Sequence, residues 1–149
     1  MLYKLLTIDD VKSLFNIGKE WVIETGNYVS DSAVMEEAIG CINDAITFGA
    51  FDTNKNDKLI GFIVLQKQKL FWFDKMVLVE NMMFVSKDYR DIGVGSKLLE
   101  FVDSLALNSK YSHVFMFPNK FGSSSPEKAK SVMEKNGYVF HGYIMRKDF

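Results

Sequence analysis

The sequence predicts an α/β or α+β domain built on a mixed sheet. The first observation is size, because 149 residues with 48% apolar side chains can form one sizeable core. The second is periodicity: short apolar runs typical of buried strands alternate with segments whose apolar residues recur at helical spacing. The third is the order of these segments, β-α-α-β-β-β-α-β-α-β-β. With two prolines and ten glycines there is little room for a linker, so we expect a single domain over residues 1–149.

The N-terminal third predicts one strand and two helices. Residues 3–8 form the strand, and the aspartate pair at positions 9–10 then opens a helix, because aspartate favours the N-cap and the first turn. The Gly-Asn pair at 26–27 ends this helix. The second helix starts near residues 30–32 and carries Cys41 on its apolar face, which indicates a small buried side chain.

The middle of the chain predicts strands and then a long helix. Residues 48–52, 59–66 and 75–85 form strands, and the polar residues 54–57 make a turn. The last two of these strands are apolar on both faces, as central strands should be. A short strand follows later, at 113–117. The helix between them is amphipathic, with apolar residues at Val94, Leu98, Phe101, Val102 and Leu105.

The C-terminal part predicts one helix and a pair of strands. Pro126 suits the first turn of the helix, with Ser125 as its cap. The Asn-Gly pair at 136–137 ends the helix. Residues 138–147 then form the strands, with a kink at Gly142.

Composition excludes several functional classes. Eighteen basic and 19 acidic side chains give a net charge of −1, without the basic surplus of a general nucleic-acid binder. No stretch approaches the roughly 20 apolar residues of a membrane span, and the acids at 9–10 come too early for a signal peptide. The single Cys41 cannot form an internal disulfide, and His113 and His141 lack metal-ligand spacing, so we expect no metal site. We expect a reducing, cytoplasmic location.

The stretch from 84 to 99 carries the most information about chemistry. Gly93 and Gly95 stand where a helix begins, and unpaired backbone N–H groups at a helix start form a cradle for an anion. A dinucleotide loop would need a small residue where Leu98 stands, and a P-loop would need its lysine one position before Lys97. Taken alone, the alternative is a glycine-rich helix start without a ligand.

The spacing Arg90-x-x-Gly93-x-Gly95 resembles the coenzyme A pyrophosphate motif of the GNAT superfamily of N-acetyltransferases, Gln/Arg-x-x-Gly-x-Gly/Ala. The segment Glu-Lys-Asn-Gly-Tyr at 134–138, preceded by Ala129, is similar to the family's closing segment. The order of strands and helices is also similar to the family's order along the whole chain.

The resemblance implies a mostly antiparallel mixed sheet, flanked by about four helices, whose central parallel strands at 75–85 and 113–117 splay apart. The pantetheine arm of acetyl-CoA would lie in that gap and pair like an added strand. Backbone N–H groups of Phe84 and Val85 would polarise the thioester carbonyl. Val85 and Arg90 would also contact the cofactor. Its pyrophosphate would rest on the N–H groups of Asp91, Ile92, Gly93, Val94, Gly95 and Ser96.

Two positions depart from the family pattern. Pro126 stands where the family often has Asn, and either Asn119 or Ser125 replaces that residue. Met133 stands where the family has a Tyr that protonates the departing thiolate, and a thioether has no proton to donate. We expect Asn119 and Met133 to contact the cofactor, with Met133 packing against the pantetheine.

Glu80 is the candidate general base, since it is an acid within an otherwise uncharged strand, and acids at this part of the strand often serve as base in similar proteins. The alternative is a structural carboxylate paired with lysine or solvent. Asn81 beside it is either a substrate contact or a bulge residue. The aromatic run at 71–73 lines a substrate groove, forms a dimer patch, or packs in the core.

Two functions follow. The first is an acetyl-CoA-dependent N-acetyltransferase, in which a primary amine of a small molecule or protein attacks the thioester directly within a ternary complex. The second is a non-catalytic CoA-binding or protein-interaction module on the same fold. A monomer or a homodimer is expected in either case, with no nucleic-acid or membrane partner.

Overall fold

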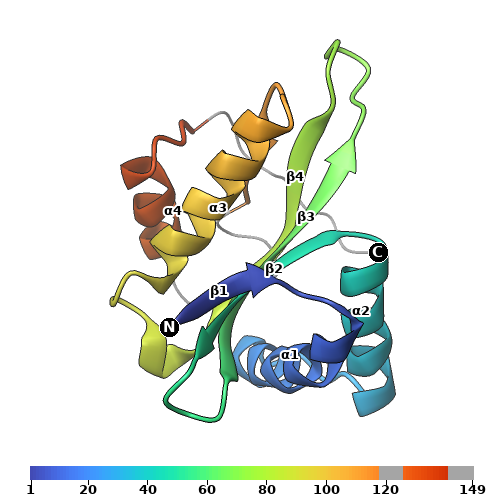
Figure 1. Cartoon of the computed structure of the whole chain (residues 1–149), viewed down its shortest axis with the longest axis vertical. Helices are drawn as coiled ribbons and strands as arrows, with labels where there is room; N and C mark the ends of the chain where they lie inside the picture. The colour runs from blue at the N-terminus through green and yellow to red at the C-terminus, as the bar shows by residue number, and fades with distance from the viewer. Residues whose placement is uncertain (118–125, 141–149) are drawn as a thin grey trace.

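The computed structural model describes residues 1–117 and 126–140. In this part of the chain, a five-stranded sheet carries helices on both faces (Figure 1). The elements in chain order are β1 (Leu2–Leu5), the 3-10 turn η1 (Ile8–Asp10), α1 (Val11–Thr25), α2 (Asp31–Asn43), β2 (Ile46–Asp52), β3 (Lys58–Gln68), β4 (Val77–Val85), the 3-10 turn η2 (Lys87–Tyr89), α3 (Val94–Asn108), β5 (Val114–Phe115) and α4 (Pro126–Lys135).

The strands lie in the order β1-β2-β3-β4-β5. The pairs β1/β2, β2/β3 and β3/β4 are antiparallel, whereas the pair β4/β5 is parallel. This parallel pair is short, because only Leu78 with Val114 and Val79 with Phe115 are in register. The predicted fold class is therefore confirmed: a mixed, mostly antiparallel sheet with a parallel pair and four α-helices among the described residues.

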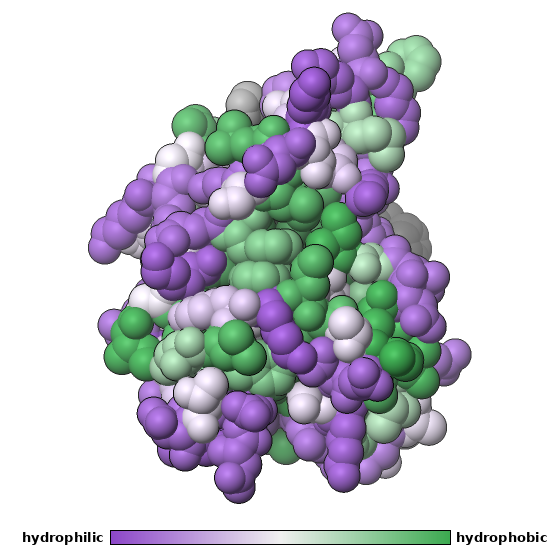
Figure 2. Space-filling view, in the orientation of Figure 1, coloured by the Kyte–Doolittle hydropathy of each residue, from purple (hydrophilic) through white to green (hydrophobic). Residues whose placement is uncertain are grey.

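Alternate residues of the strands pack against different helices. Ile63 and Leu65 belong to a core cluster with residues of α3 and α4, whereas Phe62 and Val64 join a second cluster beneath α1 and α2. Figure 1 shows the two helix pairs on opposite sides of the sheet. Figure 2 shows an apolar band where α3 meets the sheet, since several residues packed against the first cluster are only partly buried. Among the described helices, none combines the length and the apolar character that a membrane crossing requires.

The structure differs from the sequence prediction near both ends. The first strand stops at Leu5 and Ile8 already lies in η1, because Asp10 accepts hydrogen bonds from the Thr7 N–H (2.9 Å) and Lys4 Nζ (2.7 Å) and so bends the chain. At the other end, residues 138–140 have no regular structure, so the predicted final strand does not begin there. Other predictions lie outside the described residues, namely those for Asn119, Ser125, His141 and Gly142.

The tip of the β3–β4 hairpin carries the aromatic run. Phe71 is 99% exposed and Trp72 is 72% exposed, so core packing is wrong for these two residues. Phe73 turns inward instead, and its ring centroid lies 4.2 Å from that of His113, next to β5. This contact ties the loop of the hairpin to the residue that precedes β5.

Candidate active site

The pairing of β4 with β5 ends before β4 does. In the described part of the chain it stops at Val79 and Phe115, whereas β4 continues to Val85, and we call the edge of β4 beyond this point the gap. Immediately beyond this point β4 contains a bulge: Leu65 of β3 pairs with Glu80 and Val64 pairs with Met82, so Asn81 is the extra residue. A bulge bends its strand and increases the local twist, which turns β4 away from its parallel neighbour. The interpretation of Asn81 as a bulge residue is confirmed.

The register of β3 and β4 decides which backbone N–H groups face this gap. The Ser86 N–H donates to the Ile60 carbonyl at 2.8 Å, and hydrogen-bonded pairs alternate with non-bonded pairs in an antiparallel ladder. Phe84 therefore points its N–H toward β3, whereas Val85 points its N–H toward the gap. The Val85 carbonyl also faces outward, since it accepts a hydrogen bond from Arg90 Nε at 2.9 Å. Of the two predicted thioester contacts, only Val85 thus lies on the open edge.

The glycine loop sits at the start of α3. Gly93 is the N-cap and has φ +89°, a conformation in which a Cβ atom is strained. The first helical bond runs from the Lys97 N–H to the Gly93 carbonyl, so the N–H groups of residues 94–96 precede it and have no acceptor within the helix. A Cβ atom on Gly95 would lie 3.5 Å from Met83 Cε, an ordinary contact. The loop predicted to form an anion cradle therefore lies next to β4.

Arg90 contacts three parts of the fold. Besides its bond to Val85, its guanidinium donates to Glu24 Oε2 at 2.5 Å and lies 5.5 Å from the centre of the Phe84 ring. These contacts join the loop to β4 and to α1. In the structure Arg90 holds the loop in position, and its predicted contact with the cofactor stays a prediction.

A second anchor was missed by sequence reasoning. Tyr89 is buried, and its hydroxyl donates to Asp52 Oδ2 at 2.8 Å across 37 residues of chain. Asp52 also accepts a hydrogen bond from the Asn54 N–H at 3.0 Å. The pKa of Asp52 lies below its ordinary value, mainly because its carboxylate accepts the hydrogen bond from Tyr89. In the sequence, the sign of this contact is Asp52 itself, an acid at the end of the apolar run 48–52.

We expect Tyr89→Phe to lower the urea midpoint of unfolding at pH 7 and to weaken CoA binding, because the loop loses this anchor. The folded pKa of Asp52 is lowered, so its stabilising effect is present above the unfolded value of about 3.9. The effect is lost as the pH falls through the folded value. The difference between the wild type and Tyr89→Phe should therefore be smaller at pH 3 than at pH 7. An equal difference at both pH values would contradict this role for Asp52.

Glu80 directly follows Val79, where the pairing of β4 with β5 ends. Only 3% of it is exposed, and Oε2 accepts a hydrogen bond from the Phe117 N–H at 3.1 Å. Its neighbours Leu78 and Leu65 belong to the α3 cluster, so the Glu80 side chain lies on that face of the sheet. Its carboxylate therefore bridges β4 and the segment after β5 at the point where the strands separate.

Helix α4 packs beside the glycine loop. Met133 is buried in the cluster that α4 shares with α3. Lys128 pairs with Asp91 of the loop at 2.7 Å. The Tyr138 hydroxyl lies 3.5 Å from Asp103 Oδ1, and burial, then the charge of Asp103, raises the pKa of Tyr138 above its ordinary value. Tyr138 is therefore a weak proton donor in this position.

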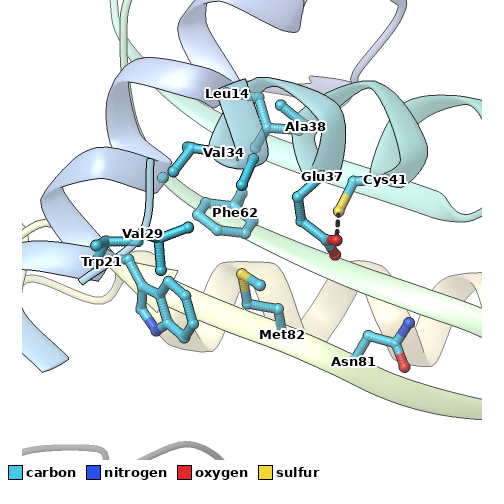
Figure 3. A pocket seen from close by; sticks show the side chains of 13 residues that line it. Leu14, Trp21, Val29, Val34, Glu37, Ala38, Cys41, Phe62, Asn81 and Met82 are labelled. Carbon is cyan, nitrogen blue, oxygen red and sulfur yellow. Dashed lines mark hydrogen bonds between the residues drawn. The ribbon is translucent and has the colours of Figure 1, made fainter. Parts of the chain in front are cut away.

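A pocket of about 520 Å³ lies on the opposite face of the sheet, between α1, α2 and the bulged part of β4 (Figure 3). We name it the α1–α2 pocket. Cys41, predicted to be a small buried side chain, is indeed buried there. The described residues that line the pocket are Leu14, Gly18, Trp21, Val22, Val29, Ala33, Val34, Glu37, Ala38, Cys41, Phe62, Asn81 and Met82.

The parallel strand pair that opens beside a glycine-rich helix start is the arrangement that the resemblance to acetyltransferases implies. Comparison with family models agrees with this geometry. Residues 43–140 match the acetyltransferase (GNAT) domain. The chain therefore belongs to the GNAT acetyltransferase family.

Solved structures share the fold at low sequence identity. A crystal structure of a probable acetyltransferase is 17% identical with a TM-score of 0.83, over 100% of this chain and 99% of that one. A Trypanosoma brucei acetyltransferase is 20% identical with a TM-score of 0.74, over 99% of both chains. A predicted acetyltransferase from Clostridium acetobutylicum, solved with acetyl-CoA, is 14% identical with a TM-score of 0.73, over 99% of this chain and 95% of that one. No curated protein matches the sequence significantly.

Proposed function

We propose that this protein is an N-acetyltransferase that uses acetyl-CoA and a primary amine. The observation that carries the proposal is that the pairing with β5 ends at Val79, whereas β4 itself continues to Val85, beside the glycine loop at the start of α3. An extended pantetheine arm can pair with this edge of β4 while its pyrophosphate meets the start of α3. Acetyl-CoA supplies the activated acetyl group, and the chain supplies binding, orientation and proton transfer.

The described residues fit this co-substrate. The N–H groups of residues 94–96 have no acceptor within the helix, and the missing side chain of Gly95 leaves room for an oxygen to approach them. The Val85 N–H faces the gap and is proposed to polarise the thioester carbonyl. Met133, buried between α3 and α4, is proposed to pack beside the pantetheine rather than to protonate the sulfur.

Deprotonating the amine is the larger chemical problem. An amine with a pKa of about 10.4 needs roughly 4.6 kcal/mol to become neutral at pH 7, whereas a thiol with a pKa of about 8.5 leaves as thiolate at a cost of about 2 kcal/mol. A proton acceptor therefore matters more than a proton donor, and water can protonate the thiolate. We propose that Glu80 accepts this proton through water, because it is a buried carboxylate of β4 at the point where the parallel pairing with β5 ends.

The test is release of CoA from acetyl-CoA, followed with a thiol reagent over a panel of primary amines, with calorimetry of CoA binding alongside. The proposal requires both tight CoA binding and amine-dependent release. CoA binding without release from any amine would favour the alternative, a non-catalytic CoA-binding module. One observation favours that alternative: Met133 stands where the family has a proton donor.

A further inference from the structure

The α1–α2 pocket has an apolar part and a polar end. Figure 3 shows Trp21 and Val29 at one end and Glu37, Cys41 and Asn81 at the other, with the Glu37 and Cys41 side chains pointing from α2 toward β4. Between the two ends the lining consists of hydrocarbon and thioether groups. A volume of about 520 Å³ falls in the range of about 300–1,000 Å³ that small-molecule sites occupy.

The polar end of the pocket lies at the bulge of β4. Asn81 is the bulge residue, two residues after Val79, the last residue of β4 in register with β5. It lies on the same strand as Val85, whose N–H is proposed to polarise the thioester carbonyl. The Glu80 side chain lies on the other face of the sheet and is not among the described lining residues. Asn81 is therefore the polar residue that β4 contributes to the pocket.

The charge of the polar end is negative. Glu37 is the only acidic residue among the described lining residues, and that lining contains no lysine or arginine. The Cys41 thiol donates to Glu37 Oε1 at 3.7 Å, and burial, then the charge of Glu37, raises the pKa of Cys41 to about 12. Cys41 therefore stays protonated at neutral pH and helps to hold the carboxylate, so it is not a nucleophile.

We propose that the acceptor is a primary amine carried by an apolar body, whose apolar part fills the α1–α2 pocket while its ammonium group lies between Glu37 and Asn81. This inference rests on the proposed function, because it names the substrate class of that reaction. Charge complementarity selects the amine over an acid, and the hydrocarbon lining selects an alkyl or aryl body over a polar one.

Direct binding tests the proposal without turnover. The chain has two tryptophans, and Trp72 is exposed at the hairpin tip, so Trp72→Phe leaves Trp21 as the reporter inside the pocket. In this background 2-phenylethylamine should change the Trp21 emission and bind at least tenfold more tightly than ethanolamine. Calorimetry with the same two amines provides a second measurement. The proposal is overturned if neither method detects 2-phenylethylamine, or if ethanolamine binds as tightly.

Variants then separate the two parts of the pocket. Glu37→Gln should weaken 2-phenylethylamine roughly fivefold, the range of an exposed ion pair, and leave 2-phenylethanol unchanged. Glu36→Gln is the matched control, since Glu36 is an exposed neighbour on α2 outside the described lining. Ala33→Trp, at an exposed lining position, should weaken both ligands at least tenfold. Equal effects of Glu36→Gln and Glu37→Gln would overturn the role of Glu37.

The two proposals fail in different ways. If 2-phenylethylamine binds but releases no CoA, the pocket assignment stands and the transferase proposal fails. If ethanolamine or a peptide amine releases CoA while 2-phenylethylamine neither binds nor reacts, the transferase proposal stands and the apolar acceptor is wrong.

Discussion

Gly95→Asp is expected to weaken CoA binding by at least 100-fold while the protein stays folded. The new carboxylate would stand among the N–H groups of residues 94–96, where the pyrophosphate is proposed to bind, and like charges at about 4 Å repel by about 4 kcal/mol at an effective dielectric constant of 20. The fold survives for two reasons. Among the described residues the added Cβ meets only Met83 Cε, at 3.5 Å, and an acid in the first turn of a helix is favourable.

The measurement is isothermal calorimetry of CoA, with urea unfolding to confirm stability. Gly95→Ala is the matched control, because it adds the same Cβ without charge and should weaken binding much less than Gly95→Asp. Gly93→Ala is less useful, since φ at Gly93 is +89° and any side chain there also strains the loop. A dissociation constant for Gly95→Asp within twofold of the wild type would remove the glycine loop from the CoA site.

Glu80→Gln is expected to lower the turnover rate roughly 100-fold or more, the usual range for a positioned base. The amide oxygen of glutamine still accepts a hydrogen bond from the Phe117 N–H, so the bridge across the root of the gap is retained. CoA affinity and the urea midpoint should therefore change little. The rate is measured as CoA release with an amine that the wild type accepts, over a range of pH.

Glu80→Ala serves as the comparison, because it removes both the proton acceptor and the bridge to Phe117. If Glu80 acts only by holding β4 and the segment after β5, the glutamine variant keeps the wild-type rate and pH profile, and only the alanine variant loses activity. If Glu80 takes the proton, both variants lose activity and the glutamine variant also loses the acidic limb of the pH–rate profile. The two variants together separate proton transfer from strand positioning.

Local features of the chain were open to prediction from the sequence. The helix starts depend on nearby residues: Ser30 accepts a hydrogen bond from the Ala33 N–H, and Gly93 adopts a left-handed conformation directly before α3. The strands β3 and β4 follow from apolar runs of a length typical of buried strands. The glycine cradle lies within a few residues of chain, so its spacing was visible as a motif. Each of these features depends on short-range sterics and hydrogen bonding.

The sequence by itself therefore determined the class of fold, the place of the glycine loop and the family to which the chain belongs. Only the tertiary structure decided how the candidate site is assembled. Arg90 meets Glu24 across 66 residues and Glu80 meets Phe117 across 37 residues. The face to which Glu80 points depends on the register around Asn81, because side chains alternate along a strand and one extra residue reverses their direction. Such contacts depend on how the elements pack together, which no local spacing of residues encodes.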